Sequence, residues 1–306
     1  MEIDEVVDHA RHTEYSDPGD RAGLFDDIDP TVDAVSAMAR NVVAHYRAQA
    51  HELPESSQQD ISLRWVAAIL DTDQHRNPMP LTVERAVSNR VQGCCRDHSL
   101  LAVSALRHHG IAARDRVGFA TYLSPTWNPD HVIVEAWLNG RWQRFDPEFA
   151  EPLPRLADPT DIPGGRNSPF LTAAHVWLGH RAGSVDVTRF GVGEGVGIGG
   201  DWFVFGYVIA EAAHRFGDEL LLWDTWGAMS SDLNLVPPDD LALVDEVAQL
   251  LVLADEGDLR AERALLDRYH HDPRLHPGTR IRSRSPYGGV TDVDLAARTA
   301  AQASWS

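Results

Sequence analysis

The sequence predicts an α+β fold, because its hydrophobic periodicity changes part-way along the chain. Apolar residues recur at helical spacing over residues 29–50 and again over residues 99–109. After Gly110, a residue type that commonly follows a helix, the period becomes two, which is the pattern of strands. Strands are expected over residues 111–122, 131–138 and 141–145. The last two flank Asn139-Gly140, the strongest short signal for a two-residue hairpin turn, so antiparallel pairing is expected.

The same periodicity predicts the other helices. In the first helix, Asp29 is the expected N-cap and Pro30 takes the first helical position. Further helices are expected over residues 61–70, 83–90, 170–178, 203–216, 241–254 and 259–269. Residues 151–168 are rich in Pro and Asp and indicate a meandering loop. The last thirty or so residues, arginine-rich and with a Pro-Tyr-Gly-Gly turn, are expected to be loosely ordered.

Composition limits the partners that suit this chain. Its 306 residues, 43% of them hydrophobic, are enough for a sizeable buried core. The formal net charge of −19 argues against nucleic acid and anionic lipid, because a negative field repels both. No apolar run approaches the roughly 18 residues of a membrane helix, and the acidic start of the chain is unlike an export signal. We therefore expect a cytoplasmic protein that binds neither nucleic acid nor membrane.

The two cysteines, Cys94 and Cys95, are adjacent, which excludes a disulfide framework and a four-cysteine zinc site. Cys95 lies at or near the start of the helix expected over residues 99–109. A thiol is a useful nucleophile only as thiolate, and a helix N-terminus stabilises negative charge through its dipole and its backbone N–H groups. Cys95 is therefore a candidate nucleophile, placed where the same N–H groups can hold an oxyanion.

The hairpin gives an independent argument for a histidine–carboxylate pair. With a two-residue turn, Trp137 faces Trp142, and by the same register Asp146 faces Ile133. Because side chains alternate faces, His131 shares a face with Ile133. His131 and Asp146 are then diagonal neighbours, with backbones about 7 Å apart and side-chain tips closer. This is the base–orienter half of a catalytic triad, and a bulge between the two residues would break the geometry.

Four fragments in this order resemble the core of the transglutaminase-like superfamily: Gly93-Cys94-Cys95-Arg96-Asp97, Gly110-Ile111-Ala112-Ala113-Arg114, His131 and Phe145-Asp146-Pro147. The resemblance covers about residues 91–147. It implies a papain-like arrangement in which the nucleophile helix packs on an antiparallel sheet. It also implies that Cys95 is the nucleophile, His131 the base and Asp146 the orienting carboxylate, with no metal and no organic cofactor.

The flanking sequence is similar to bacterial members of the family that carry a helical C-terminal extension. The similar segments are residues 15–19, 45–47, 166–170 and 222–227. We accordingly divide the chain into three parts. They are an N-terminal helical part of the core (1–90), the catalytic core motif (91–150) and a loop-rich, helical extension that packs on the core (151–306).

The expected reaction is cysteine-dependent acyl transfer through a thioester on an amide or thioester substrate. Resolution by an amine would form an amide bond, as in a transglutaminase, and resolution by water would make the protein a peptidase or amidase. The expected partner is a peptide or small-molecule acyl substrate, with an acyl carrier protein as a further candidate. The alternative is a binding module that keeps this fold without turnover, although such a scaffold has no need of an intact Cys, His and Asp set.

Other residues near the nucleophile have ordinary structural explanations. Cys94 points about 100° away from Cys95 on a helix and is the weaker candidate nucleophile. His98 is an alternative base, but helix capping or packing is favoured. Asp97 is expected to bind backbone or Arg96 near the helix start.

Several motifs elsewhere are weaker. A side-chain donor to the oxyanion is expected, with Gln92 and Trp65 as candidates. Residues 195–200 satisfy G-x-G-x-x-G but lack a surrounding βαβ unit, so a flexible loop is favoured over dinucleotide binding. Glu211 and His214 have metal-ligand spacing, but a polar surface face is the default interpretation. A solvated loop is the expected setting of His270, His271 and His276. Cross-strand packing is expected for the pair Trp137–Trp142.

Overall fold

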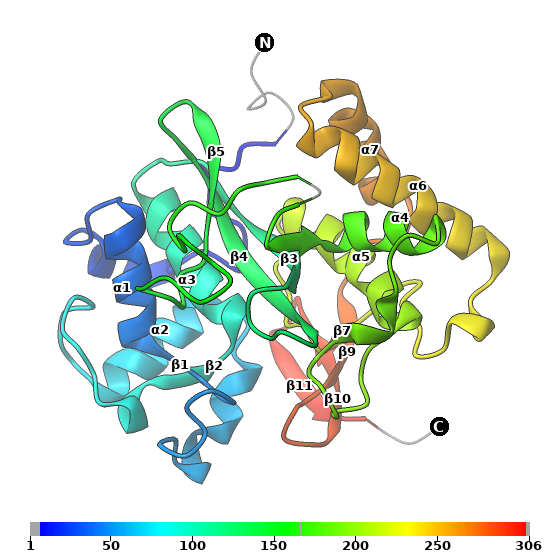
Figure 1. The fold of residues 1–306 in the computed structure, drawn as a ribbon. Coiled ribbons are helices and arrows are strands. Elements are labelled where there is room, and N and C mark those ends of the chain that lie inside the picture. The colour runs from blue at the N-terminus through cyan, green and yellow to red at the C-terminus, as the bar shows by residue number, and fades with distance from the viewer. Residues whose placement is uncertain (1–6, 166, 304–306) are drawn as a thin grey trace. The chain divides into compact units, whose positions relative to one another are not determined.

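The predicted α+β class is confirmed by the computed structural model, which describes residues 7–165 and 167–303 (Figure 1). The chain forms two compact units, and each is described by itself. The core unit comprises residues 8–116 and 131–164. The second unit comprises residues 1–7, 117–130 and 165–306. The three-part division predicted from the sequence stays a prediction.

The first helix of the core unit is shorter than its apolar pattern indicates. Helix α1 spans Val32–Val42. Its N-cap is Thr31 rather than the predicted Asp29, because the Thr31 hydroxyl accepts a hydrogen bond from the Ala34 N–H at 3.3 Å. A hydroxyl cap of this kind satisfies one of the N–H groups that have no partner within the helix.

The residues after α1 form a strand instead of the predicted continuation of the helix. Strand β1 (Val43–His45) pairs in parallel with β2 (Val91–Gly93). This pairing places His45 opposite Gly93, and the Tyr46 N–H donates to the Gly93 carbonyl at 2.9 Å. Pairing with a distant segment overrides local helix preference here, and it brings His45 to the residues that precede Cys95.

Two further helix predictions in the core unit need correction. The second helix, α2, spans Val66–Arg76, so it begins five residues after the predicted start at Ile61, which lies in a 3-10 helix, Glu55–Ser62. Residues 83–90 contain only a 3-10 turn, Val87–Asn89, and no α-helix. The buried Arg85 guanidinium holds this segment in an irregular path by binding the Asp73 carboxylate at 2.9 Å.

The predicted strands form the sheet of the core unit, in the order β5-β4-β3. The strands are β3 (Ala113–Ala120), β4 (Asn128–Leu138) and β5 (Arg141–Phe145), and β3 and β4 each continue into the second unit. The predicted hairpin register is confirmed, because Trp137 pairs with Trp142. Both turn residues have positive φ, 53° at Asn139 and 78° at Gly140, as a type I′ turn requires.

Helix α3 (Cys95–His108) begins at the candidate nucleophile and is buried along nearly its whole length. It packs against α1 and α2 within the core unit. One turn after Cys95, the Ser99 hydroxyl donates to the Val132 carbonyl of β4 at 3.0 Å. Gly110 follows the helix with φ +73°, the left-handed conformation that favours glycine at this position. The helix is thus tied to the sheet beside His131.

The second unit is mainly helical. Its helices are α4 (Ala173–Arg181), α5 (Asp201–Arg215), α6 (Pro238–Asp255) and α7 (Leu259–His271). Helix α4 packs on both α5 and α6, and α6 on α7. The segment predicted as a helix over residues 170–178 opens instead with strand β6 (Phe170–Thr172), which pairs with β3, and α4 then begins at Ala173. Strand β7 (Phe190–Gly191) pairs in parallel with the start of β4.

The C-terminal segment is an ordered sheet rather than the loosely ordered chain predicted. Its strands, in the order β11-β10-β9-β8, are Thr299–Gln302, Val290–Asp294, Arg280–Arg284 and Asp224–Thr225. Along β9, buried Ile281 and Ser283 alternate with exposed arginines, and Ile281 pairs with buried Val293. This alternation is a strand signal that the high arginine content concealed.

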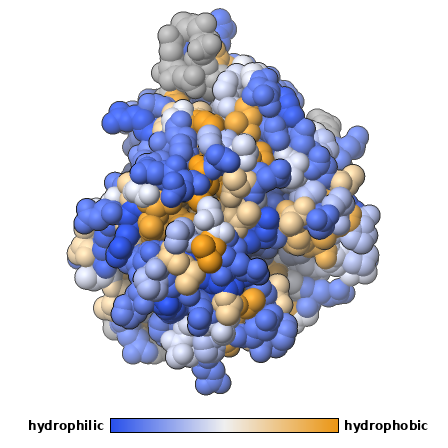
Figure 2. Space-filling model, turned by 90° about the vertical axis from the view of Figure 1, so that its left-hand side faces the viewer, coloured by the Kyte–Doolittle hydropathy of each residue, from blue (hydrophilic) through white to orange (hydrophobic). Residues whose placement is uncertain are grey.

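The face drawn in Figure 2 is largely hydrophilic, with hydrophobic residues in small groups. Such a surface matches the acidic composition of the chain, with 46 Asp and Glu residues against 27 Lys and Arg. Over the described ranges, 7–165 and 167–303, no helix combines the length and the hydrophobicity needed to cross a membrane.

Candidate active site

Cys95 is the first residue of α3 and is almost fully buried, with 3% of its surface exposed. The preceding residue, Cys94, is extended (φ −133°), so the chain turns into the helix at this point. The Asp97 carboxylate accepts from the Cys94 N–H at 2.8 Å and from Arg96 Nη1 at 2.9 Å. The predicted structural role of Asp97 is therefore confirmed, and Cys95 lies at the positive end of a well-capped helix dipole.

Gly93 allows the turn into α3 to be this tight. A Cβ atom at position 93 would lie 2.7 Å from Asp97 Oδ2 and 2.9 Å from Val43 Cγ1. Both contacts are too close for carbon, so a larger residue would displace either the cap or strand β1. The glycine of the sequence motif is thus explained by close approach, since its own φ is not in the left-handed region.

His131 and Asp146 meet as the hairpin register predicts. The His131 Nε2 atom lies 2.7 Å from Asp146 Oδ2, and both side chains are buried. Because a carboxylate only accepts, Nε2 carries the proton and donates it, which leaves Nδ1 as the basic nitrogen of the neutral ring. The carboxylate fixes both the tautomer and the orientation of the imidazole.

Asp146 is itself held in place by its neighbours. Its second oxygen, Oδ1, accepts from the Glu148 N–H at 3.0 Å, and its own N–H donates to the Pro159 carbonyl at 2.8 Å. Arg40, on α1, donates to the Pro147 carbonyl at 2.8 Å. These contacts fix the segment directly after β5, so the carboxylate has little freedom to leave His131.

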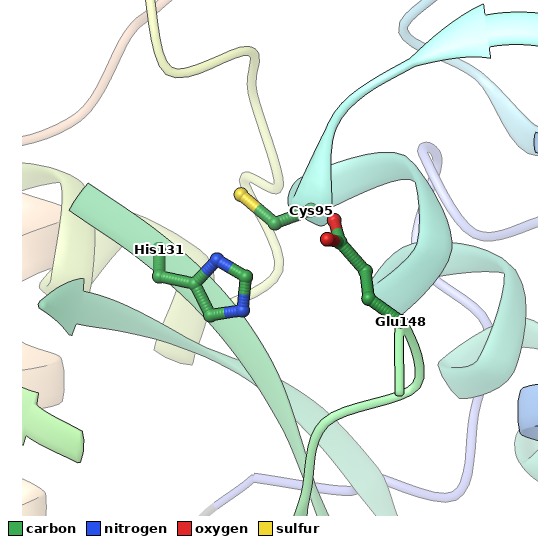
Figure 3. Close-up of side chains that lie close together, drawn as sticks. All are labelled: Cys95, His131 and Glu148. Carbon is green, nitrogen blue, oxygen red and sulfur yellow. The ribbon is translucent and has the colours of Figure 1, made fainter. Parts of the chain in front are cut away.

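Three reactive side chains converge on one small region of the core unit (Figure 3). One ligand atom from each of Cys95, His131 and Glu148 lies within 4.8 Å of the others. Since Nε2 of His131 is bound to Asp146, Nδ1 is the nitrogen available to the Cys95 thiol, and Figure 3 shows this nitrogen on the sulfur side of the ring. The three residues that the sequence singles out, Cys95, His131 and Asp146, are thus brought together.

Glu148 is a member of this cluster that the sequence reasoning missed. Its Oε1 atom is buried and makes no hydrogen bond within the described part of the chain. The nearby His98 Nδ1 lies 3.4 Å away, but its hydrogen bond, at 2.9 Å, goes to the Cys94 carbonyl. His98 is therefore anchored to the residue that precedes Cys95, which fits the structural role favoured for it over that of a base. The position of Glu148, two residues after the orienting aspartate, is the signal that could have identified it.

His45 is a second residue that the sequence gave no reason to place in the site. Burial lowers the pKa of His45, the Glu148 carboxylate raises it, and the neighbouring His98 and His131 lower it; the net shift is downward. A lowered pKa keeps this imidazole neutral at pH 7. His45 reaches the site because β1 pairs with β2, a long-range contact that local periodicity does not reveal.

The surroundings of Cys94 make its thiol a poor nucleophile. A hydrogen bond with the Cys95 side chain lowers the pKa of the Cys94 thiol, whereas burial and the Asp97 carboxylate raise it; the net effect is a raised pKa. Cys94 therefore remains a protonated thiol at neutral pH. This favours Cys95 as the nucleophile of the adjacent pair.

The two suggested oxyanion donors have other contacts. The Gln92 amide donates to the Pro54 carbonyl at 2.9 Å and to Ser57 Oγ at 2.6 Å. Trp65 stacks on Tyr15, with ring centroids 6.4 Å apart and planes 2° from parallel. In this structure, both side chains serve packing and loop anchoring.

The weaker motifs of the second unit resolve into structural roles. Glu211 and His214 are buried, contrary to the surface location expected for them. Glu211 Oε2 accepts from the Ala174 N–H at 2.8 Å, and His214 Nε2 lies 3.1 Å from the Leu220 carbonyl. Their spacing reflects anchoring of α5 to its neighbours.

The remaining motifs lie on several elements. Residues 192–199 form a glycine-rich loop between β7 and α5, as favoured over a dinucleotide site. His270 and His271 belong to the exposed end of α7 rather than to a loop. The predicted packing of Trp137 against Trp142 is confirmed, with ring centroids 5.7 Å apart in an edge-to-face arrangement.

Comparison with known proteins supports the fold assignment. Residues 26–147 match the family model of the transglutaminase-like superfamily. This chain contains a transglutaminase-like superfamily domain. The match includes Cys95, His131 and Asp146, so the resemblance seen in the sequence is confirmed. A search of curated proteins found no match.

One similar solved structure is that of a putative cysteine protease from Cytophaga hutchinsonii. The alignment has 22% sequence identity and a TM-score of 0.31, and it covers 50% of this chain and 43% of the other. This chain therefore spans less than half the length of that protein. At this level of similarity the comparison carries no argument about the reaction.

Proposed function

We propose that this protein is a cysteine-dependent acyl-transfer enzyme with Cys95 as nucleophile, His131 as general base and acid, and Asp146 as the orienting carboxylate. One observation carries the proposal. The His131–Asp146 hydrogen bond of 2.7 Å is buried, and it leaves the other imidazole nitrogen for a thiol at the start of α3. Nucleophile, base and orienter in this chain of contacts form the general arrangement of a catalytic triad.

In the proposed reaction, His131 Nδ1 takes the proton of Cys95 and the thiolate attacks the acyl carbon of an amide or thioester. The carbonyl oxygen becomes an oxyanion, stabilised by the positive end of the α3 dipole. Collapse of the intermediate breaks the bond to the leaving amine or thiol, which receives its proton from His131. The result is a thioester on Cys95.

The thioester is then resolved by water or by an amine. In either case His131 takes a proton from the attacking group and returns it to the Cys95 sulfur as the thioester bond breaks. Water would give a free acid, as in a peptidase or amidase, and an amine would give an amide. The chain has no lysine, so a lysine acceptor must come from another molecule. Peptides, small acyl compounds and acyl groups on a carrier protein are the candidate substrates.

The test measures thiol reactivity and needs no knowledge of the substrate. Intact-mass spectrometry would follow brief iodoacetamide treatment at about pH 6.5, where an ordinary thiol with a pKa near 8.5 is almost wholly protonated. We expect fast addition of a single label that is lost in Cys95→Ala and slowed in His131→Ala. Cys94→Ala is the matched control, since it removes the neighbouring thiol and is expected to keep the fast label.

Labelling of the wild type no faster than that of a free thiol would overturn the proposal. Labelling located on Cys94 would do the same. Either result would favour the alternative interpretation, which is a binding module without turnover. If the label behaves as expected, acyl donors can be screened, and the product, acid or amide, would decide between water and amine.

A further inference from the structure

Glu148 has no part in the proposed reaction, although its carboxylate lies beside both reacting groups. Its side chain is only 12% exposed, and its Oε1 atom is buried without a hydrogen bond among the described residues. A buried carboxylate oxygen without a donor is costly, which makes it a place to look for a missing cation. One oxygen of the same carboxylate lies close to a thiol and an imidazole (Figure 3).

We propose that Cys95, His131 and Glu148 form a Zn²⁺ site, and that bound zinc holds the nucleophile in an inactive state. Thiolate sulfur, imidazole nitrogen and carboxylate oxygen are the three ligand types that zinc takes in proteins. Three protein ligands leave a fourth position for water, which suits an exchangeable metal. Zinc binding at these three residues does not require acyl transfer, whereas its inhibitory role rests on the proposed function.

The geometry needs only side-chain adjustment. In a tetrahedral zinc site, ligand atoms about 2.0–2.3 Å from the metal are separated from one another by roughly 3.5 Å. The three ligand atoms here lie within 4.8 Å of one another. Closing the remaining gap is within reach of rotations of the Glu148 and Cys95 side chains, because His131 is already fixed by Asp146.

The charges of the three ligands favour binding of Zn²⁺. Binding releases the Cys95 thiol proton to solvent, so the sulfur enters as thiolate. His131 binds as a neutral imidazole through Nδ1, and Glu148 binds as a carboxylate. Two negative ligands neutralise Zn²⁺, which lowers the cost of burying the ion. With glutamine at position 148 the same site would keep a net positive charge.

A neighbouring carboxylate supplies the hydrogen bond that usually orients a histidine ligand of zinc. A metal-bound histidine usually donates its other ring N–H to a carboxylate, which fixes the ring and raises its basicity. His131 already makes this contact, through Nε2 to Asp146 Oδ2 at 2.7 Å. The contact that orients the proposed base is thus also the one that prepares a metal ligand.

Metal titration tests the proposal on the whole protein after removal of metals with a chelator. Co²⁺, a spectroscopic substitute for zinc, should give a sulfur-to-metal charge-transfer band in the near ultraviolet, and Zn²⁺ should displace it at one ion per chain. Glu148→Gln should weaken zinc binding by at least about 10-fold, and Cys95→Ser should abolish the band. Glu151→Gln, an exposed glutamate three residues further on, is the matched control and should bind as the wild type does.

An unchanged zinc affinity in Glu148→Gln, or a charge-transfer band that persists in Cys95→Ser, would overturn the proposed site. Circular dichroism of each variant would show that it is folded. The iodoacetamide assay separates this failure from failure of the proposed enzyme. Fast labelling of metal-free protein that zinc does not suppress would keep the triad and remove the metal site. Slow labelling of metal-free protein that still binds zinc through Cys95 would do the reverse.

Discussion

Two buried carboxylates of the core unit, Glu135 and Glu148, are treated in opposite ways by their surroundings. Glu135, on β4, accepts hydrogen bonds from Arg114 Nε and Arg144 Nε at 2.7 Å and from Arg116 Nη1 at 3.0 Å. Burial raises the pKa of Glu135, but Arg116, Arg114 and Arg144 lower it, and the net value is well below the usual range. Glu148 has a buried oxygen that accepts no hydrogen bond from the residues that the structure describes.

These different surroundings give the two carboxylates different roles: Glu135 stabilises the fold, whereas Glu148 is available to a ligand. Three guanidinium groups saturate the acceptor sites of Glu135 and tie β3, β4 and β5 together. Arg114 also lies over the Trp142 ring, 4.4 Å from its centroid, so this cluster is packed as well as neutralised. Within the described part of the chain, the Glu148 carboxylate instead lies near a thiol and two imidazoles, those of Cys95, His131 and His98. A buried polar group whose hydrogen-bond partners are all present stabilises the fold. A buried polar group that lacks them is a candidate ligand-binding site.

The largest effect is expected from replacing Asp146, the carboxylate that binds the His131 ring in the candidate site. Asp146→Ala removes the acceptor of the His131 Nε2 proton, so the ring loses its orientation and tautomer. We expect labelling of Cys95 at pH 6.5 to slow by up to about 10²-fold, towards the rate of an ordinary thiol, because a thiol with a pKa near 8.5 is only about 1% ionised at this pH. Asp146→Asn is the informative comparison, because its amide oxygen can still accept from Nε2 without the charge. Partial recovery in Asp146→Asn would assign the effect to orientation, and equal rates in Asp146→Ala and wild type would contradict the triad.

The next largest effect is expected from replacing Glu135, whose carboxylate binds three arginines. Glu135→Gln leaves three buried or nearly buried arginines without their counter-charge, which should lower the free energy of unfolding by about 3–5 kcal/mol at pH 7. Urea unfolding followed by circular dichroism measures this change. The Cys95 labelling rate under native conditions should stay unchanged, since Glu135 binds three arginines that lie outside the triad. An unfolding free energy equal to that of the exposed control Glu151→Gln would show that the cluster contributes no stability.

The pKa of Glu135 also predicts how the free energy of unfolding changes with pH. Because the folded-state pKa of Glu135 lies below its usual value of 4.5, its charge stabilises the fold above pH 4.5. This contribution is lost as the pH falls from 4.5 through the folded-state pKa. The difference in unfolding free energy between wild type and Glu135→Gln should therefore shrink from pH 5 towards pH 3. A difference that stays constant over this range would contradict the assigned pKa shift.

The parts of the site that local sequence rules govern could be predicted, and the rest could not. Cys95 was found because a helix start is visible in the apolar pattern, and His131 and Asp146 because a two-residue turn fixes side-chain parity. Glu148 and His45 join them through tertiary contacts. The segment containing His45 carries a helical pattern that parallel pairing of β1 with β2 overrides. A single sequence carries no signal for such pairing.

The errors in the fold have a similar origin. Residues 83–90 favour a helix locally, but the buried ion pair of Arg85 with Asp73 holds them in an irregular path. In the C-terminal sheet, arginines on β9 suggested solvated chain, whereas alternate residues Ile281 and Ser283 are buried. Composition misled here because one face of a strand can be fully charged while the other packs. Period-two alternation would have been the better guide.

A smaller effect is expected where helix α3, which begins at Cys95, is hydrogen-bonded to strand β4, which carries His131. Ser99→Ala removes the hydrogen bond from α3 to the Val132 carbonyl, next to His131, and leaves that carbonyl buried without its donor. The free energy of unfolding should fall by about 0.5–1.5 kcal/mol. Labelling of Cys95 should slow modestly, because the distance between Cys95 and His131 is no longer fixed at this point. Ser104→Ala, on the same helix but bonded to Ser16, is the matched control that should alter stability alone.

The smallest stability effect is expected at Glu148, and this is the sharpest test of the comparison. Glu148→Gln removes a charge but no hydrogen bond to its buried Oε1 atom, so the free energy of unfolding should change by less than about 1 kcal/mol, with a gain more expected than a loss. The same substitution at Glu135 is expected to cost several times more, although the chemical change is identical. Urea unfolding of both variants in metal-free buffer measures the two effects side by side. Equal losses would mean that Glu148 is as well compensated as Glu135, and the argument for a ligand at its carboxylate would fall with that result. A small effect of Glu148→Gln in metal-free buffer that becomes a large loss of stability when zinc is added would connect the stability difference to the metal site, because zinc would stabilise the wild type more than the variant.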